Sequence, residues 1–204
     1  GSQALDARAL IEAQAATVAL AAELAEASAT TPPLVNLGGG FGIPYFAGDT
    51  PLDVAQVGAA LAARCAALPD ELAGTELAIE LGRWLVGEAG VYLTRVIDRK
   101  ESRGETFVVV DGGLHHQLAA TGNFGTVVRR NYPLAIATRF DAEPAELAGV
   151  VGCLCTPLDR LAERAALPRA EVGDLVAVFC AGAYGASASP AAFLGHGPAN
   201  EILV

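Results

Sequence analysis

Helical and extended apolar stretches alternate along the first ninety residues, and this alternation limits the folds that the chain can adopt. Residues 4–29 and 51–68 carry apolar side chains at helical spacing, and prolines follow both stretches. Residues 34–37 and 77–81 are short apolar runs, typical of strands that are covered on both faces. A further helical turn or two is expected at residues 84–90. This order predicts parallel α/β units.

The pattern changes after residue 90, where glycines, prolines and charged turns separate short stretches rich in β-branched residues. One helix is expected at residues 158–166, and a charged turn is expected around Lys100. Strands are expected at residues 91–98, 106–111, 132–139, 150–154, 175–180 and 202–204. The sequence therefore predicts an α/β domain at residues 1–90 and a mostly β domain at residues 91–204.

Composition and charge exclude several classes of function. The chain is 52% apolar with a mean hydropathy of +0.40, so it can bury a core. The net charge of −10 opposes general binding of nucleic acid. No apolar run reaches the roughly 20 residues that a membrane span needs, and no secretory signal is visible. We therefore expect no nucleic-acid partner, no membrane partner and a cytoplasmic location.

The spacing of the cysteines and histidines argues against a metal site. Cys153 and Cys155 form a C-x-C pair, and no second pair follows at zinc-ligand spacing. His115 and His116 are adjacent, and adjacent side chains on a strand point to opposite faces. We expect free thiols in a reducing compartment and no bound metal ion.

Two segments with glycines follow the expected strands of the α/β part. The run from Gly38 to Gly42 can turn with positive φ and present N–H groups to a phosphate, although a structural turn explains it equally well. The run from Glu80 to Arg83 combines a carboxylate, a glycine and a cation. Such a set suits a cofactor that has a cationic nitrogen and a phosphate, and a salt bridge at a strand end is the alternative.

Three segments of the mostly β part also follow expected strands. Asp111 precedes a pair of glycines, Cys155 opens the run Cys-Thr-Pro-Leu-Asp, and Tyr184 precedes Gly185. A turn would explain each segment singly, and a cysteine more often packs than reacts. The information lies in the order of all five segments along the chain.

In this order the segments resemble the fold-type III pyridoxal-phosphate decarboxylases, the family of ornithine and diaminopimelate decarboxylases. Four of the motifs look most like those of a subgroup associated with exosortase and exopolysaccharide gene clusters. These motifs are Gly-Gly-Gly-Phe-Gly-Ile-Pro-Tyr-Phe, Glu-Leu-Gly-Arg, Asp-Gly-Gly-Leu-His-His and Leu-Cys-Thr-Pro-Leu-Asp. The resemblance covers the whole chain. It implies an α/β plus β fold: the last part of a TIM (β/α)8 barrel of the alanine-racemase type, followed by a mostly β domain. It also implies a homodimer.

The resemblance implies that one set of residues binds pyridoxal 5'-phosphate. This set is Ser2, Gly38, Gly39, Gly40, Glu80, Gly82, Arg83 and Tyr184. Ser2, Gly40 and Gly82 would hold the phosphate, and Tyr184 would close over it. Arg83 would lie by the phosphate or by the carboxylate of an amino-acid substrate.

The resemblance implies catalytic roles for Glu80 and Cys155. A carboxylate facing the pyridine nitrogen favours its protonated form, which helps the ring accept electrons as CO₂ leaves. Cys155 would protonate the product carbon, reaching with Asp111 into the partner subunit's site. Thr156 and Asp159 would lie beside the substrate.

One part of the family's machinery has no match. The lysine that carries the cofactor lies in the family on the first barrel strand, upstream of the position of Gly1, and the only lysine here is Lys100. The chain also begins without methionine. We therefore expect a fragment of a larger decarboxylase. An enzyme similar to alanine racemase and a non-catalytic module of the same fold are the alternatives.

The residue after the cysteine bears on the substrate. Ornithine and diaminopimelate decarboxylases carry an acid there, whereas Cys155 is followed by Thr156. A hydroxyl cannot neutralise a buried ammonium, so we expect a substrate whose distal end is acidic, neutral or masked, including one linked to a carrier. Arg129, Arg130 and His115 are candidates for binding such a distal end, with exposed strand-end charges as the alternative.

Overall fold

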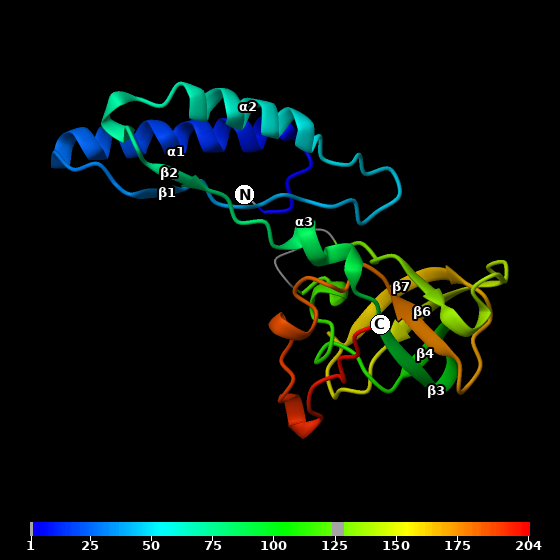
Figure 1. Ribbon diagram of the computed structural model, residues 1–204. Coiled ribbons are helices and arrows are strands. Elements are labelled where there is room, and N and C mark those ends of the chain that lie inside the picture. The colour runs from blue at the N-terminus through cyan, green and yellow to red at the C-terminus, as the bar shows by residue number, and fades with distance from the viewer. Residues whose placement is uncertain (1, 124–128) are drawn as a thin grey trace. The chain divides into compact units, whose positions relative to one another are not determined.

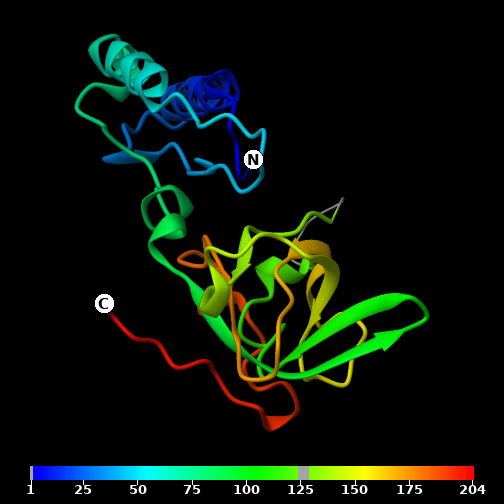
Figure 2. The same cartoon turned by 90° about the vertical axis from the view of Figure 1, so that its right-hand side faces the viewer.

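The computed structural model describes residues 2–123 and 129–204. Its contacts divide the chain into two compact units, Gly1–Leu85 and Val86–Val204. Figures 1 and 2 show both units from two sides. The division falls a few residues before the expected boundary at 90/91. Within the described residues, no helix is both long enough and apolar enough to cross a membrane.

Two long helices dominate the first unit, and an aspartate caps the start of each. Helix α1 (Ala7–Ser28) follows Asp6, and helix α2 (Val54–Ala66) follows Asp53. Each aspartate side chain accepts a hydrogen bond from a backbone N–H of the first turn. Such caps satisfy N–H groups that have no partner inside the helix, which explains where both helices begin.

A pair of parallel strands lies beside these helices. In this pair, β1 (Leu34–Asn36) and β2 (Glu76–Ala78) align so that Val35 lies opposite Leu77. The helices cover one side of the strands (Figure 1). Apolar side chains fill the space between, and Leu72 of the 3-10 turn η1 (Asp70–Leu72) is 0% exposed. Burial of a side chain of this size contributes about 1.5–3 kcal/mol.

A short helical region follows, as expected for residues 84–90. It consists of α3 (Arg83–Val86) and the 3-10 turn η2 (Gly87–Ala89).

The second unit is built around a six-stranded sheet with the order β5-β8-β3-β4-β6-β7. Its strands are β3 (Tyr92–Ser102), β4 (Glu105–Val110), β5 (Leu134–Ile136), β6 (Glu146–Val151), β7 (Arg160–Leu167) and β8 (Leu175–Val178). Its short 3-10 turns are η3 (Ala119–Thr121), η4 (Ala137–Arg139), η5 (Ala186–Ala188) and η6 (Phe193–Gly195). Neighbouring strands are antiparallel except β4 and β6. Fully buried valines, among them Val108, Val150 and Val176, form its core, which confirms the mostly β prediction.

Strands β3 and β4 form a hairpin that is longer than expected (Figure 2). Ser102 pairs with Glu105, and the two residues between them, Arg103 and Gly104, have φ values of +54° and +79°. Positive φ at both central residues is characteristic of a two-residue hairpin turn. The turn expected around Lys100 is therefore wrong, because this residue is still within strand β3.

The helix expected at residues 158–166 is also wrong, because this segment forms strand β7. Ala162 and Ala165 are both buried, which is a spacing typical of one face of a helix. A β-bulge causes this spacing. Ala148 pairs with Ala165, and Val150 pairs with Ala162, so two steps along β6 correspond to three steps along β7. Pairing with β6 therefore outweighs the high helix propensity of the segment.

Two further expectations are wrong. Residues 202–204 form no strand, and Leu203 is 101% exposed. His115 and His116 lie in a turn after β4 rather than on a strand, and the centroids of their rings are 3.8 Å apart. These two side chains therefore do not lie on opposite faces of a strand.

Candidate functional site

The glycine loop at residues 38–42 leaves β1 and runs beside the segment that contains Ser2 and Ala4. Ala4 N donates to Gly40 O at 2.8 Å, and Gly42 N donates to Ala4 O at 2.9 Å. A Cβ at Gly42 would lie 2.8 Å from Ala4 O, so this close approach requires glycine. The structure therefore brings the segment of Ser2 next to the loop, as a shared phosphate site needs.

The same loop contacts the chain just after β2. Glu80 N donates to Gly38 O at 2.9 Å, and a Cβ at Gly39 would lie 2.3 Å from Glu80 O. Gly38 and Gly40 have φ values of +79° and +87°, which favour glycine. Within the described residues, the N–H groups of Gly39 and Gly40 form no backbone hydrogen bond. These groups are suited to bind an anion.

An asparagine holds the carboxylate of Glu80 beside the loop. Asn36 Nδ2 donates to Glu80 Oε1 at 2.6 Å, while Asn36 Oδ1 accepts from Gly38 N at 2.8 Å. Glu80 is exposed, so its carboxylate is open to a ligand. One side chain thus fixes the start of the glycine loop and the orientation of the carboxylate.

The two remaining candidates of the first unit follow Glu80 directly. A Cβ at Gly82 would meet no atom within 4 Å, so the packing of the described chain does not require glycine there. Arg83 donates from Nη1 to the hydroxyl oxygen of Tyr45 at 2.6 Å, and its guanidinium lies 5.5 Å from the centre of that ring. Stacking and hydrogen bonding hold the guanidinium in place.

In the second unit, Asp111 is exposed at the end of β4. Its Oδ1 accepts from Thr94 Oγ1 at 2.7 Å and from Arg95 N at 2.8 Å. Thr94 Oγ1 in turn accepts from Gly112 N at 2.9 Å. These contacts fix the direction of the carboxylate, which leaves it available to a ligand in a set orientation.

Asp159 is 3% exposed and has no access to a substrate in the described structure. Its Oδ1 accepts from Leu114 N at 2.6 Å, and its Oδ2 accepts from Leu154 N at 2.8 Å. A Cβ at Gly113 or Gly152 would lie 2.1 or 2.2 Å from its carboxylate oxygens. The expectation that Asp159 touches substrate does not fit this burial: the side chain joins the loops after β4 and β6.

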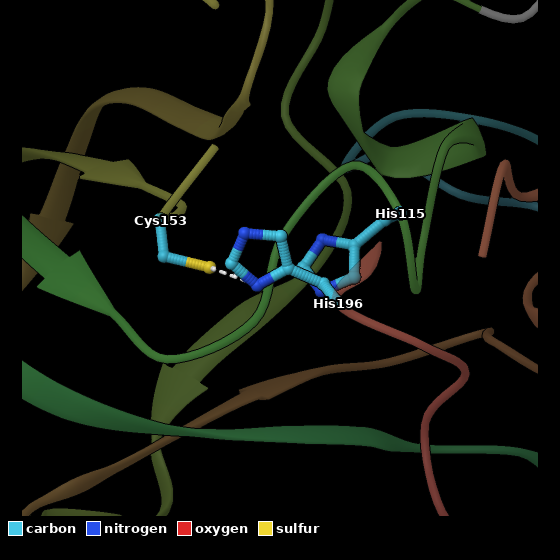
Figure 3. Close-up of side chains that lie close together, drawn as sticks. All are labelled: His115, Cys153 and His196. Carbon is cyan, nitrogen blue, oxygen red and sulfur yellow. Dashed lines mark hydrogen bonds between the residues drawn. The ribbon is translucent and has the colours of Figure 1, made fainter. Parts of the chain in front are cut away.

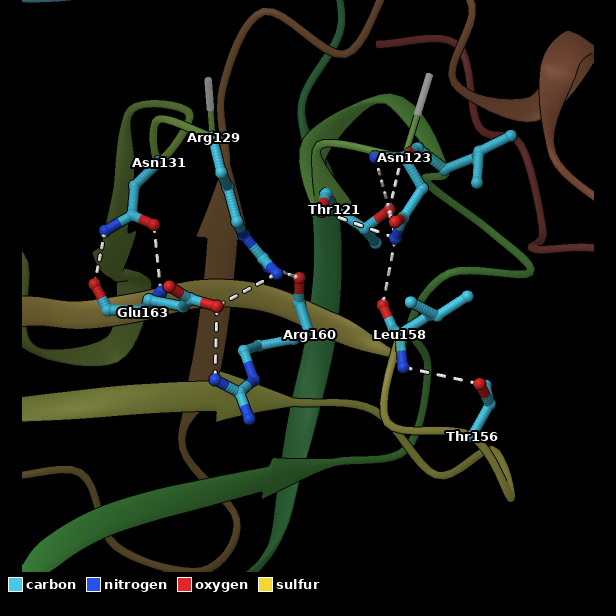
Figure 4. Close-up of polar contacts among 9 residues, drawn as sticks. Thr121, Asn123, Arg129, Asn131, Thr156, Leu158, Arg160 and Glu163 are labelled. Atoms are coloured by element: carbon cyan, nitrogen blue, oxygen red, sulfur yellow. Dashed lines mark hydrogen bonds and ion pairs between the residues drawn. The ribbon is translucent and has the colours of Figure 1, made fainter. Parts of the chain in front are cut away.

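Cys155 and Thr156 lie on the loop that Asp159 holds. Cys155 is exposed and is a free thiol. Thr156 is half-buried, and its Oγ1 accepts from Leu158 N at 3.3 Å (Figure 4). The thiol is therefore accessible, on a loop fixed by a buried carboxylate.

Tyr184 is 43% exposed and has a φ of +59°. Such a φ is unusual for a bulky residue and marks a position that the surrounding chain constrains. Gly185, which follows it, packs closely: a Cβ there would lie 2.6 Å from Ala181 O. The turn thus directs the Tyr184 side chain outward.

Of the candidates for binding an acidic distal end, Arg129 is engaged within the chain and His115 is buried. Arg129 pairs with Glu163, with Nη1 and Oε1 3.1 Å apart, and donates to Arg160 O (Figure 4). Burial lowers the pKa of Arg129 from its ordinary value, and Glu163 opposes this shift. His115 is 1% exposed. Arg130 is exposed.

The sequence did not single out Asn36 or Tyr45, although both hold candidate residues in place. A signal existed for each of them. Asn36 is the one polar residue in an otherwise apolar run directly before the glycine loop, and Tyr45 follows that loop. A polar residue at the end of a short buried strand is a reason to look for a ligand or a neighbour that it holds.

The chain is similar to known decarboxylases in sequence and in fold. The model of the pyridoxal-dependent decarboxylase C-terminal sheet domain matches residues 24–182. The L-glutamyl-(BtrI acyl-carrier protein) decarboxylase of Niallia circulans is 42% identical, covering 100% of this chain and 48% of that protein. The diaminopimelate decarboxylase of Archaeoglobus fulgidus is 35% identical, covering 100% of this chain and 47% of that protein. The crystal structure of diaminopimelate decarboxylase from Helicobacter pylori with L-lysine superposes with a TM-score of 0.71 at 27% sequence identity. The superposition covers 93% of this chain and 44% of that chain.

These matches and the fold identify a decarboxylase sheet domain, here together with an α/β unit. The chain belongs to the pyridoxal-dependent decarboxylase family. It spans about half the length of the curated relatives that it matches.

Proposed function

We propose that the whole protein is a pyridoxal-phosphate-dependent decarboxylase that releases CO₂ from an α-amino acid. The observation that carries this proposal is the exposed Glu80 carboxylate, held by Asn36 beside a glycine loop with available N–H groups. Lys100 is exposed on β3, among charged residues of the hairpin. We therefore assign the lysine that carries the cofactor to a part of the protein outside these 204 residues.

The residues of the first unit fit the cofactor. The N–H groups of Gly39 and Gly40 and the open space at Gly82 suit a phosphate, and Arg83 adds a positive charge. In this proposal Ser2, Gly40 and Gly82 hold the phosphate, Gly38 and Gly39 shape the turn, and Arg83 lies by the phosphate or by the carboxylate of the substrate. Tyr184 is proposed to close over the phosphate. We further propose that this unit is the end of a (β/α)8 barrel, which the parallel order of β1 and β2 supports.

When bound, the cofactor supplies an electron sink for the loss of CO₂ from the α-carbon. Glu80 holds a proton at the pyridine nitrogen, because a carboxylate next to that atom favours its protonated form. Cys155 delivers a proton to the product carbon from its exposed thiol. Asp159 acts on this step from a distance, since it fixes the loop on which Cys155 lies.

We propose that the working assembly is a homodimer in which Cys155 and Asp111 serve the partner subunit's site. Mixed dimers test this arrangement. A Cys155→Ala protein combined with one that lacks the cofactor lysine should recover part of the activity, because one site in the mixed dimer is intact. Absence of recovery in verified mixed dimers would contradict a shared site.

We propose a substrate whose distal end is acidic, neutral or masked by a carrier. Thr156 follows Cys155 and offers a hydroxyl where an ammonium would need an acid. The name of the Niallia circulans relative, at 42% identity, gives a glutamyl group on an acyl-carrier protein as its substrate. Arg130, which is exposed, remains a candidate for contact with an acidic distal end or an acidic carrier.

We also propose a cytoplasmic enzyme of exopolysaccharide metabolism. The four free cysteines support a reducing compartment such as the cytoplasm. The sequence motifs that resemble the subgroup associated with exopolysaccharide gene clusters support a role in exopolysaccharide metabolism.

The experiment that tests the proposed function compares the full-length protein with its Glu80→Gln variant. The substitution keeps the shape of the side chain and removes its charge. Decarboxylation should fall on the order of a hundredfold, about 2.7 kcal/mol of barrier. Cofactor binding, followed by its absorption, should change little because the phosphate contacts are intact. A Glu80→Gln protein as fast as the parent would contradict this role, and absence of CO₂ release by the full-length protein from every amino acid tried would favour a non-catalytic module.

A further inference from the structure

Three side chains with metal-binding atoms meet in the second unit, from segments far apart in the sequence. His115 lies in the turn after β4, Cys153 on the loop after β6, and His196 in the C-terminal segment (Figure 3). One ring nitrogen of each histidine and the sulfur of Cys153 lie within 4.8 Å of one another. Cys153 Sγ lies 3.9 Å from His196 Nδ1.

One histidine of this cluster, His115, has a buried ring nitrogen without a hydrogen-bond partner among the described residues. His115 is 1% exposed, and its Nδ1 has no hydrogen-bond partner in the described structure. A buried polar nitrogen without a partner costs about 1–3 kcal/mol. The imidazole ring of a histidine can bind a metal ion through such a nitrogen.

One of the three separations is close to that in a tetrahedral zinc site, and the other ligand atoms lie within 4.8 Å. Zn–S and Zn–N bonds of about 2.3 and 2.1 Å at the tetrahedral angle place the two ligand atoms about 3.6 Å apart. The separation of 3.9 Å between Cys153 Sγ and His196 Nδ1 needs a shift of only a few tenths of an ångström. His196 is exposed on a segment without regular structure, so it can make this adjustment.

The surrounding charges also favour a cation. Asp111 O accepts from Cys153 Sγ at 3.4 Å, and the carboxylate of Asp159 accepts from the N–H of the next residue, Leu154. The negative charges of these two aspartates attract a divalent cation, and a bound zinc ion would neutralise the charge of the Cys153 thiolate.

We propose that His115, Cys153 and His196 bind one zinc ion, with water in a fourth position. Binding replaces the thiol proton of Cys153: the S–H bond breaks, a Zn–S bond forms and the proton passes to the solvent. The weak hydrogen bond from Cys153 Sγ to Asp111 O, at 3.4 Å, is lost in this exchange. The ion ties the C-terminal segment to the loops that carry Asp111 and Cys155.

The site is separate from the residues assigned to the cofactor. None of the three proposed zinc ligands is among the residues that we assign to cofactor binding. The proposed proton donor Cys155 is not among the three ligands either. Zinc binding can therefore be measured without pyridoxal phosphate or substrate, so its failure and the failure of the proposed function are distinguishable.

Calorimetric titration of the metal-free, reduced full-length protein with Zn²⁺ tests the proposal. We expect one ion per chain, with release of one proton detected by repeating the titration in buffers of different protonation enthalpy. Cys153→Ser and His196→Ala should each weaken binding at least tenfold. His196 is exposed, so its replacement leaves the core intact even if a change at Cys153 disturbs folding.

Cys65→Ser is the matched control, because Cys65 is exposed on α2 in the other unit. This variant and Cys155→Ser should bind Zn²⁺ as the parent chain does. Cobalt substitution should add a thiolate charge-transfer band that disappears in Cys153→Ser alone among the cysteine variants. Absence of stoichiometric binding, or equal binding by His196→Ala and the parent, would overturn the proposal.

Discussion

The side-chain amide of Asn36 donates to Glu80 Oε1 at 2.6 Å and so joins the ends of two parallel strands. Its oxygen accepts from Gly38 N at 2.8 Å, which extends the same connection into the glycine loop. The position of the carboxylate and the conformation of the loop therefore depend on one side chain. Asn36 is a positioning residue, because its effect passes through Glu80.

Replacing Asn36 by alanine should lower decarboxylation on the order of tenfold, about 1.4 kcal/mol. The carboxylate would keep its charge and lose its orientation, so the loss should be smaller than that in Glu80→Gln. In the double variant, Asn36→Ala should add almost nothing to the effect of Glu80→Gln. CO₂ release by the four proteins measures this coupling, and fully additive losses would show that Asn36 does not act through Glu80.

Two glycines should respond differently to alanine. A Cβ at Gly39 would lie 2.3 Å from a backbone oxygen, so Gly39→Ala should destabilise the chain by about 1–3 kcal/mol. Gly82 has open space around it, so Gly82→Ala should leave the midpoint of urea unfolding unchanged. The same substitution should weaken cofactor binding by the full-length protein tenfold or more, because the added methyl group occupies the space assigned to the phosphate. Unchanged cofactor affinity would remove Gly82 from that site.

The buried carboxylate of Asp159 should matter for stability. Asp159→Asn replaces one accepting oxygen by an amide that faces a backbone donor, at Leu114 N or Leu154 N. A buried donor left without an acceptor costs about 1–3 kcal/mol. Urea unfolding should show this loss, whereas Asp141→Asn, at an exposed position, should be neutral. Equal stability of both variants would contradict the role of Asp159 in joining the two loops.

The stability of the second unit should depend on pH through Asp174. Burial alone would raise the pKa of this carboxyl, but hydrogen bonds from Glu171 N, Arg139 and Thr138 outweigh burial and lower the pKa below its usual value. A lowered pKa in the folded state stabilises the fold above the unfolded pKa of about 3.9, and this stabilisation is lost as pH falls through the folded value. Asp174→Asn should thus be less stable than the parent at pH 7.

The difference between the two proteins should shrink as the pH falls below about 4, because the parent carboxyl then also becomes neutral. Urea midpoints measured from pH 7 to pH 3 test this convergence. A difference that stays constant over that range would show that the charge of Asp174 contributes nothing.

The sequence predicted the parts of the fold that local patterns determine. The helices and strands of the first unit follow from apolar spacing and proline positions, and the segments of Gly38 and Glu80 were each predicted to follow a strand. The order of the five motifs along the chain predicted the decarboxylase family, whereas no single motif was specific enough to do so. In each case the information lies within a short stretch of chain or in the order of such stretches.

The remaining features depend on contacts between distant residues. The bulge between Ala162 and Ala165 gives β7 a helical spacing, which only its pairing with β6 reveals. Asp159 matched a family position, yet its burial depends on two glycines from separate loops. The cluster of His115, Cys153 and His196 could not be found from spacing, because it assembles residues from three loops.

Measuring CO₂ release by the full-length protein from a panel of free and acylated or carrier-linked amino acids tests the proposed decarboxylase and its substrate together. The panel includes free ornithine, lysine and diaminopimelate beside glutamate in free and carrier-linked form. We expect the highest kcat/KM for an amino acid whose distal end is acidic, neutral or masked. A clear preference for free ornithine, lysine or diaminopimelate would contradict this expectation.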